Sequence, residues 1–295
     1  MINVRRSVFI GLGGAGIRAI LQVKALLLDH YGHEGELPPC FSFLGVDTDE
    51  HALENEAISK TGRKVRLLPH ERFFARVDYP HLYYQTNQER MTWMPKQNVN
   101  YLTSMSHGAG SMRTNGRMAF LYNHDQLRMK VTDTLYSVFN PFLQSKWGNI
   151  QFAQGPISVH VVFSLCGGTG SGMFLDFSYL LRERTYMLNM PCNIHGYGIM
   201  PGVFMDESKH PKYAGLLLPN SYAALRELDY LMHLPTADGR GIKMPWMMME
   251  TNEHPFDDFV LVDNTSATGL RYHRISDLVE MLTQSLVADI VGKIL

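Results

Sequence analysis

The segment Ser158–Asp176 constrains the fold more than any other part of the chain, because three patterns follow one another in it without a break. Residues 159–163 are mostly β-branched and apolar, which is typical of a buried strand. Residues 167–172 read Gly-Gly-Thr-Gly-Ser-Gly, and apolar side chains then recur at helical spacing from Phe174. A strand, a glycine loop and a helix in this order can hold a phosphate. Glycines expose backbone N–H groups, and a helix N-terminus carries about half a positive charge.

The residues around this loop narrow the kind of phosphate site that it can form. No lysine follows the glycines, so the loop is not a Walker A loop. Its threonine and serine add hydroxyl donors to the backbone N–H groups. We therefore expect the whole loop to bind phosphate, and its residues are Gly167, Gly168, Thr169, Gly170, Ser171 and Gly172.

Composition excludes several classes of partner. The chain has 295 residues, of which 19% are charged, and its net charge is −1. This balance gives no electrostatic reason to expect a nucleic acid or an anionic membrane as a partner. Cys40, Cys166 and Cys192 have no metal-ligand spacing, and their odd number fits a reducing compartment. No apolar run approaches the roughly twenty residues of a membrane span. We expect a cytoplasmic protein with no membrane span and no protein-only metal site.

Strand and helix patterns alternate along most of the chain. The predicted strands are Ser7–Gly11, Phe41–Asp47, Val65–Leu68, Val159–Ser164, Cys192–Met200 and Phe259–Asp263. The predicted helices are Ala15–Tyr31, Gly116–Gln144, Gly172–Leu188, Ser221–His233 and Ile275–Leu295. This order predicts an α/β protein with a Rossmann-like parallel sheet and helices on both faces.

One segment, near residues 70–105, departs from the alternation. It is rich in Tyr, Trp, Met and Gln, so it is too apolar to be disordered. We expect an ordered insertion. A packed excursion of the chain is favoured over an insertion that lies beside the ligand site or forms a contact surface.

Two further glycine clusters accompany the first. Residues 11–18 read Gly-Leu-Gly-Gly-Ala-Gly-Ile-Arg, and residues 107–117 read His-Gly-Ala-Gly-Ser-Met-Arg-Thr-Asn-Gly-Arg. The earlier cluster also fits the Gly-x-Gly-x-x-Gly fingerprint of a dinucleotide fold, and Asp47 stands where that fold places its ribose-binding acid. A dinucleotide fold needs only one glycine-rich phosphate loop. The presence of three glycine clusters therefore favours a site in which all three surround one polyphosphate. The candidate residues added by these clusters are Gly11, Gly13, Gly14, Arg18, Asp47, Gly108, Ala109, Gly110 and Arg117.

These loops together resemble the nucleotide loops of the tubulin and FtsZ superfamily, and the resemblance covers almost the whole chain. Residues 11–18 are similar to the first FtsZ loop, with Arg18 where that family usually has asparagine. Residues 46–49 resemble the second loop, and residues 108–110 resemble the third loop, which senses the γ-phosphate. The fourth loop is 167–172, where Cys166 replaces a third leading glycine.

The resemblance implies GTP or GDP as the ligand, with Mg²⁺ bridging the phosphates mostly through water. Asp47 or Asp49 could hold one of those waters, and a helix N-cap role is an equal alternative for either acid. Asp206 matches the acid of the fifth loop that contacts the ribose. Tyr272 and Asp277 are the nearest matches to the aromatic and polar residues that contact guanine at the start of the central helix.

The resemblance also implies a role. Residues 1–295 would be the GTP-binding domain of a divergent prokaryotic tubulin-like protein, ending in the central helix and lacking the C-terminal activation domain. Such a protein would be a GTP-dependent switch or a filament-forming element that associates with itself. In the family, acids that follow the central helix position the attacking water, so we expect little or no hydrolysis by this chain alone, and we assign no catalytic residue. A non-polymerising nucleotide-binding adaptor and an NAD-dependent oxidoreductase remain alternatives.

Overall fold

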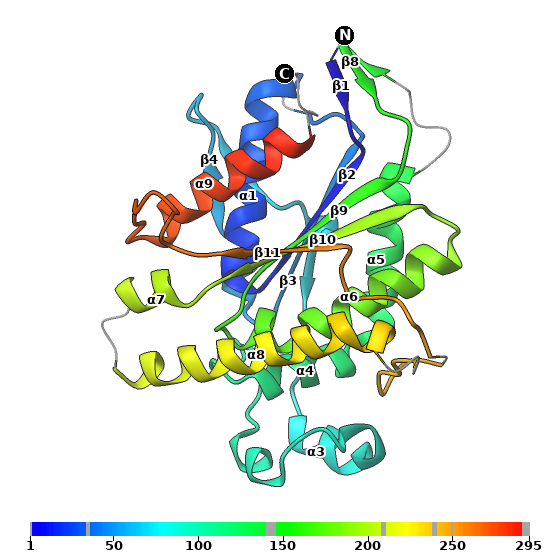
Figure 1. The fold of residues 1–295 in the computed structure, drawn as a ribbon, viewed down its shortest axis with the longest axis vertical. Helices are drawn as coiled ribbons and strands as arrows, with labels where there is room; N and C mark the ends of the chain where they lie inside the picture. Colours follow the sequence, from blue (N-terminus) through cyan, green and yellow to red (C-terminus); the bar gives the residue numbers. More distant parts are fainter. Residues whose placement is uncertain are drawn as a thin grey trace.

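The centre of the protein is a six-stranded parallel sheet, seen in a computed structural model that describes residues 2–33, 36–139, 146–207, 211–237, 241–248 and 250–290. The strand order is β11-β10-β9-β2-β3-β6, and every neighbouring pair is parallel (Figure 1). The strands are β2 (Ser7–Leu12), β3 (Phe41–Asp47), β6 (Arg72–Phe74), β9 (Ile157–Ser164), β10 (Cys192–Ile199) and β11 (Asp258–Val262). The predicted fold class is confirmed.

Helices cover both faces of this sheet. On one face α1 (Gly13–Tyr31) packs against α9 (Ile275–Ile290). On the other lie α4 (Arg113–Tyr122), α5 (His124–Phe139) and α6 (Thr169–Met187), and α8 (Pro211–Ala237) packs on α6 (Figure 1). The remaining helices are α2 (Glu50–Leu53), α3 (Pro80–Thr86) and α7 (Gly202–Glu207). Short strands outside the sheet are β1 (Ile2–Val4), β4 (Glu56–Ile58), β5 (Lys64–Arg66), β7 (Lys146–Trp147) and β8 (Ile150–Phe152).

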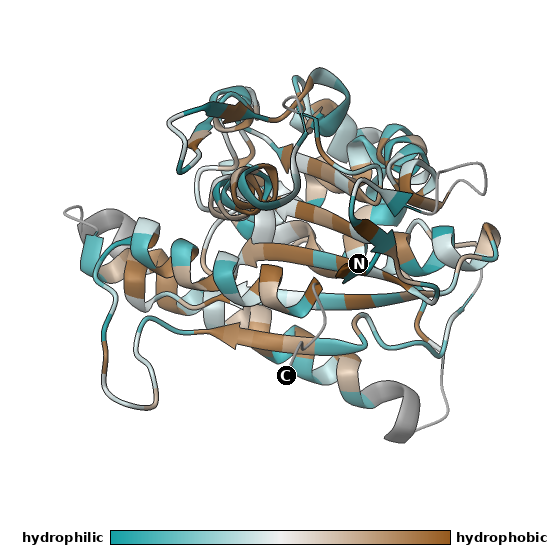
Figure 2. Ribbon diagram, turned by 90° about the horizontal axis from the view of Figure 1, so that it is seen from above, coloured by the Kyte–Doolittle hydropathy of each residue, from teal (hydrophilic) through white to brown (hydrophobic). Residues whose placement is uncertain are grey.

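The core lies in two layers, one on each side of the sheet. All eight residues of β9 are buried, and its successive side chains enter opposite layers. Val161 and Phe163 face α4, α5 and α6, whereas Val162 faces α1 and α9. Figure 2 shows the same arrangement as apolar strands enclosed between amphipathic helices. A strand buried on both faces is the reason that its sequence reads as an unbroken apolar run.

The direction of the chain through the sheet reverses between β2 and β9. From β2 the chain moves outward through β3 to β6, and from β9 it moves the opposite way through β10 to β11. Ligands of open parallel sheets bind at such a switch point, outside the carboxyl ends of the strands. The glycine loops 11–18 and 167–172 directly follow the two strands that flank this point. The fold therefore brings these two loops together.

Two sequence predictions are wrong in detail. The predicted strand Val65–Leu68 is not in the main sheet. Lys64–Arg66 pairs only with β4 in a separate hairpin, and the next sheet strand is β6. The helical region Gly116–Gln144 is two helices, α4 and α5, and its last residues lie outside the described part, as does the end of the predicted helix Ile275–Leu295.

The insertion near residues 70–105 is ordered and packed. It contains β6, α3 and the 3₁₀ helices η1 (Pro69–Glu71), η2 (Gln88–Met91) and η3 (Lys96–Tyr101). Met91, Met94, Leu102 and Met105 are buried in the same core layer as α4, α5 and α6. The favoured interpretation, a packed excursion, fits this burial. Its α3 lies at the end of the molecule beyond α4 (Figure 1).

A buried ion pair ties the start of the insertion to α1. Lys24 and Glu71 form a contact in which both side chains are less than a tenth exposed. The Lys24 ammonium also donates to the carbonyl oxygen of Arg66 at 3.1 Å, and Glu71 accepts from the backbone N–H of Leu68 at 2.6 Å. Removal of one partner leaves an uncompensated buried charge, which is far more costly than loss of an exposed pair.

We expect Lys24→Met to lower the free energy of unfolding by about 3–5 kcal/mol. The double variant Lys24→Met/Glu71→Leu should recover most of this loss, because it leaves no unpaired charge. Lys64→Met, which breaks the exposed pair with Glu56, is the matched control and should cost less than about 1 kcal/mol. Urea unfolding measures all three, and equal costs for Lys24→Met and Lys64→Met would contradict the prediction.

Candidate functional site

Two long helices begin at the switch point without side-chain caps. The N-cap residues are Leu12 for α1 and Gly168 for α6, and neither helix has an acidic residue in its first turn. The first backbone N–H groups of an α-helix have no partner within the helix, and they lie at the positive end of its dipole. Two such ends at the carboxyl edge of one sheet form a site suited to an anion.

The glycines of the loops fall into two groups, and the first group serves packing. A Cβ on Gly16 would lie 2.1 Å from the carbonyl oxygen of Val162, and one on Gly170 would lie 2.5 Å from that of Leu12. The same holds for Gly172, whose Cβ would be 2.2 Å from the carbonyl oxygen of Arg113. A Cβ would also lie within 3 Å of its nearest neighbour at Gly11, Gly116 and Gly168. These glycines permit close contact of backbones within the protein.

At the second group of glycines a Cβ would meet no atom closer than ordinary van der Waals distance. At Gly14, Gly167 and Gly108 the nearest atoms to a Cβ would be 3.9, 3.6 and 3.8 Å away, and at Gly110 none would lie within 4 Å. Gly14 belongs to the first loop, Gly167 to the fourth, and Gly108 and Gly110 to the third. They leave the backbone accessible to a ligand, as the sequence interpretation requires of a phosphate site. Gly13 is intermediate, with φ of +75° and a Cβ position 3.1 Å from the Gly170 nitrogen.

A hydrogen-bonded cluster joins the end of β3 to the start of α6. The Asp47 Oδ1 atom accepts from the backbone N–H of Thr48 at 2.7 Å and from the Thr169 hydroxyl at 3.0 Å. The hydroxyl groups of Thr48 and Thr169 are 2.6 Å apart. The Oδ2 atom of Asp47 lies on the side of Gly14, 3.9 Å from the position of its Cβ. The second and fourth loops are thus joined by side chains, and the sequence interpretation did not anticipate the part of Thr48.

The two acids of the second loop have different roles. Asp49 caps α2, since its side chain accepts from the backbone N–H of His51 at 3.1 Å, so the N-cap alternative is confirmed for this residue. Asp47 is buried, and burial raises the pKa of its carboxyl to about 6 against the hydrogen bonds that lower it. A carboxylate kept in such a place destabilises the fold and is a candidate for a functional role.

The third glycine cluster lies against the second loop rather than at the end of a strand. It follows η3 and irregular chain, and α4 begins within it at Arg113. The Gly108 N–H donates to the carbonyl oxygen of Thr48 at 3.0 Å, and the carbonyl oxygen of Ala109 accepts from Asn115 at 3.2 Å. Gly108, Gly110 and the non-glycine Ser111 all have positive φ, of 97°, 61° and 58°.

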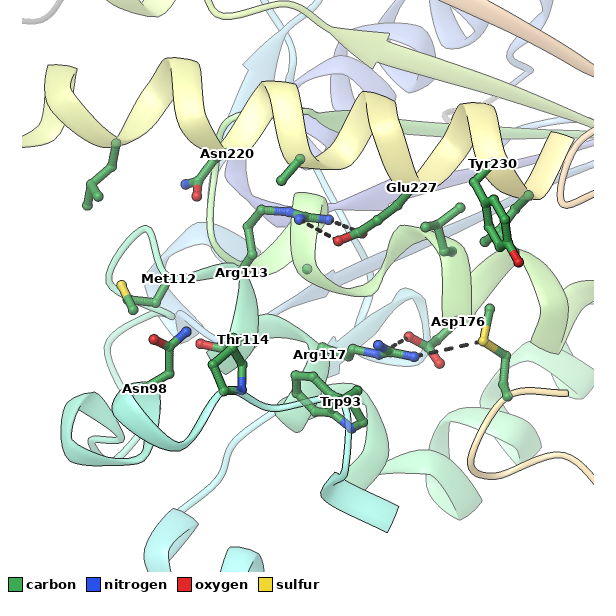
Figure 3. A pocket seen from close by; sticks show the side chains of 17 residues that line it. Trp93, Asn98, Met112, Arg113, Thr114, Arg117, Asp176, Asn220, Glu227 and Tyr230 are labelled. Atoms are coloured by element: carbon green, nitrogen blue, oxygen red, sulfur yellow. Dashed lines mark hydrogen bonds and ion pairs between the residues drawn. The ribbon is translucent and has the colours of Figure 1, made fainter. Parts of the chain in front are cut away.

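Arg117, predicted to belong to the phosphate site, is directed elsewhere. It lines a cavity of about 550 Å³ between α4, α6, α8 and the insertion, shown in Figure 3. Its Nε atom donates to Asp176 at 2.9 Å, and its guanidinium lies 4.7 Å from the centre of the Trp93 ring. Arg113 lines the same cavity and pairs with Glu227 of α8. Each arginine is therefore paired with an acid of a neighbouring helix, Arg117 with Asp176 of α6 and Arg113 with Glu227 of α8.

A second cavity, of about 250 Å³, lies between α1 and α9. Arg18, Gln22 and Ser276 line it, together with Asn55 and Glu56 from the segment after α2. Arg18 and Gln22 are four residues apart on α1, so helical spacing alone could have identified Gln22. Neither of the predicted base-contacting residues of the α9 region lines this cavity.

The remaining predicted residues surround the start of α9. Asp206, an exposed residue of α7, accepts from Arg271 at 3.0 and 2.7 Å and from Asn264 at 3.1 Å. The hydrogen bond from Arg271 holds the pKa of Asp206 below its ordinary value. Tyr272 is half-buried, with its backbone paired to Asn264, and Asp277 is exposed in the first turn of α9. Their ribose and base roles stay predictions.

The stability of the fold should depend on pH through Asp47. Its folded pKa of about 6 is above the ordinary value of 3.8, so the folded protein binds this proton more tightly than the unfolded chain. Stability should therefore fall as pH rises from about 4 to about 6, by about 3 kcal/mol in all. Asp47→Asn should abolish this fall and be the more stable protein above about pH 6.

Chemical denaturation over this pH range measures the effect. Asp49→Asn is the matched control, because asparagine is an equally good N-cap, and it should keep the wild-type dependence. An unchanged pH dependence in Asp47→Asn would show that its carboxyl does not titrate as the geometry indicates.

Comparison with solved structures supports the same fold. CetZ2 from Haloferax volcanii, in a GTPγS-bound protofilament, has a TM-score of 0.53 and 15% identity, covering 97% of this chain and 58% of its own. CetZ from Methanosaeta thermophila has a TM-score of 0.52 and 15% identity, covering 98% and 54%. A GTPγS-form protofilament of TubZ from Bacillus thuringiensis serovar israelensis has a TM-score of 0.50 and 14% identity, covering 98% and 56%. This chain thus spans a little over half the length of each.

The sequence comparisons settle the family. No protein of curated function matches the chain. Among the residues that the structure describes, no helix is long and apolar enough to cross a membrane. A family model described as "Tubulin like" matches residues 8–294, which is nearly the whole sequence. With its Rossmann-like sheet, its glycine loops at the switch point and this match, the chain belongs to the tubulin-like family.

Proposed function

We propose that the carboxyl edge of the sheet binds a guanine nucleotide, GTP or GDP, with its phosphates at the switch point. The observation that carries the proposal is the pair of uncapped helix N-termini of α1 and α6, flanked by glycines that leave room for a Cβ. Backbone N–H groups near Gly14, Gly110 and Gly167 would donate to the phosphate oxygens. Gly13, Gly168, Thr169, Gly170 and Ser171 would set the shape of this surface.

The base would enter the smaller cavity between α1 and α9. This cavity lies along α1 from its N-terminus, which is where a nucleoside attached to the phosphates would extend. Arg18, Gln22 and Ser276 offer donors and acceptors for the edge of a base. Tyr272 and Asp277 remain family-implied candidates for base contacts, and Asp206 for the ribose. Asp206 would have to exchange its bonds with Arg271 for a ribose hydroxyl.

Mg²⁺ would accompany the nucleotide and neutralise part of the phosphate charge. The described residues contain no group of three or more His, Cys, Asp or Glu side chains that could hold a metal ion. The phosphates themselves would therefore be its main ligands, as Mg²⁺ often binds through one or two carboxylates and water. Asp47 fits the remaining role, because its Oδ2 atom lies beside Gly14 and could hold a water of the ion.

The proposed mechanism is that of a switch. A γ-phosphate would contact the third loop, where the non-glycine residue Ser111 is held in a sparsely populated conformation. The similar CetZ2 and TubZ structures are protofilaments, so we also propose that the intact protein associates with itself into filaments or oligomers. An adaptor that binds nucleotide without assembly would show the same binding but no concentration-dependent sedimentation.

Calorimetry with GDP, ADP and NADH tests the ligand. We expect GDP to bind at least about tenfold more tightly than ADP or NADH, because the base cavity and the phosphate loops would act together. ADP separates the choice of base from the binding of phosphates, and NADH represents the dinucleotide alternative. Tighter binding of NADH than of GDP would overturn the proposal.

Gly14→Val tests the phosphate position without disturbing the packing of the protein. A Cβ on Gly14 would be 3.9 Å from its nearest neighbours, Ala52 and Asp47, which is an ordinary contact distance, so the fold should be retained with a change in stability of at most about 1 kcal/mol. The added side chain would occupy the space of the phosphates, and GDP affinity should fall at least about a hundredfold. Gly215→Val on α8, where a Cβ would meet nothing within 4 Å, is the control and should bind normally. Unchanged affinity in a folded Gly14→Val protein would place the ligand elsewhere.

A further inference from the structure

One side-chain amide on α8 connects the third and fourth loops. The Nδ2 atom of Asn220 donates to the carbonyl oxygen of Ser111 at 2.8 Å and to that of Cys166 at 2.9 Å. Ser111 belongs to the third loop, and Cys166 directly precedes the glycines of the fourth. Both hydrogen atoms of the amide are used, so the positions of the two carbonyl oxygens are set relative to one side chain.

The Ser111 carbonyl belongs to a strained residue. Ser111 is a non-glycine residue with φ of 58°, and it follows Gly110 at 61°. Residues in this left-handed region cost free energy and persist only where their surroundings hold them. The bond from Asn220 is one of the contacts that hold this part of the third loop. A change in the backbone conformation of the third loop at Ser111 would therefore alter the hydrogen bond from Asn220.

A second contact from the same helix reaches the fourth loop. Glu227 lies seven residues after Asn220, two turns along α8, and its side chain points toward Arg113 in Figure 3. Glu227 accepts from the Nη1 atom of Arg113 at 3.0 Å, and the Nε atom of Arg113 donates to the Ser171 hydroxyl at 2.9 Å. One face of α8 is thus connected to the two loops at two positions, directly through Asn220 and through Arg113 from Glu227.

The sequence of α8 weakens the helix beside the first contact. Pro219 immediately precedes Asn220 and lies inside the helix. Proline has no N–H, so the helical hydrogen bond to the carbonyl oxygen of Gly215 is not made. The helix can yield at this point at lower cost than elsewhere, which suits a segment that follows movements of the loops.

We propose that Asn220 is a positioning residue, which sets the spacing of the third and fourth loops and transmits the state of the third loop to α8. The proposal rests on the proposed nucleotide site. Because both donors of one amide are engaged, a shift of Ser111 toward a γ-phosphate must either move Asn220 or break one of its bonds. Nucleotides with and without a γ-phosphate should therefore leave α8 in different states.

The experiment compares GTPγS and GDP affinities of the wild type with those of Asn220→Ala and Asn220→Asp. Alanine removes the donors, and aspartate keeps the shape but places a carboxylate against two carbonyl oxygens. We expect the affinity ratio of GTPγS to GDP to fall at least about fivefold in both, because the third loop faces only the γ-phosphate. Asn98→Asp is the control for Asn220→Asp. It adds one negative charge to the same large cavity and should keep the wild-type affinity ratio.

Amide hydrogen exchange supplies a readout that a merely structural role would not change. In the wild type, exchange in residues 215–233 should differ between GTPγS and GDP at saturating nucleotide. In Asn220→Ala the difference should disappear, although nucleotide is bound. A folded Asn220→Ala protein with an unchanged affinity ratio and unchanged exchange difference would overturn this inference alone. A wild type that binds neither nucleotide would overturn the proposed function and this inference together.

Discussion

The structure depends on the approach of α1 and α6 to the two central strands, which is possible only because the residues at the contact have no side chain. The Cβ positions of Gly16 and Gly170 lie within 2.5 Å of the carbonyl oxygens of Val162 and Leu12. Any larger residue would push a helix away from the sheet. The same approach places two helix N-termini at the switch point, so the constraint on packing and the origin of the positive potential are the same feature.

The sheet could be predicted from the sequence wherever a pattern is local. The strand Ile157–Ser164 is buried on both faces, and its unbroken apolar run reveals it directly. The strand Arg72–Phe74 could not be found, because it has three residues, of which one is charged, and its place in the sheet comes from long-range pairing with β3. The predicted strand Val65–Leu68 overlaps the hairpin strand Lys64–Arg66 instead, since a short alternating segment carries no information on the strand with which it pairs.

The residues of the candidate site also differ in whether a local sequence pattern reveals them. Loop composition indicated Gly14, Asp47 and Thr169, because each follows a recognisable strand or begins a helix. It also indicated Arg117, whose direction depends on how α4 packs, and the structure pairs this residue with Asp176. Asn220 could not be predicted at all. An asparagine in a helix has no distinguishing pattern, and its importance arises only when α8 crosses the two loops.

The glycines of the loops are present for two different reasons, and this affects how the motif is interpreted. Gly168, Gly170 and Gly172 are required by contacts inside the protein, so they would be needed even if no ligand were ever bound. Gly14 and Gly167 have no such requirement, because a Cβ there would meet only atoms at ordinary contact distance and neither residue has a positive φ, whereas Gly108 and Gly110 have the positive φ that favours glycine. Cys166 supports this distinction, because it stands where the family has a further glycine and its side chain is accommodated beside the Ser164 hydroxyl. The crowded positions of the motif are therefore explained by the fold itself, and the proposed phosphate site rests on the positions that leave room for a Cβ.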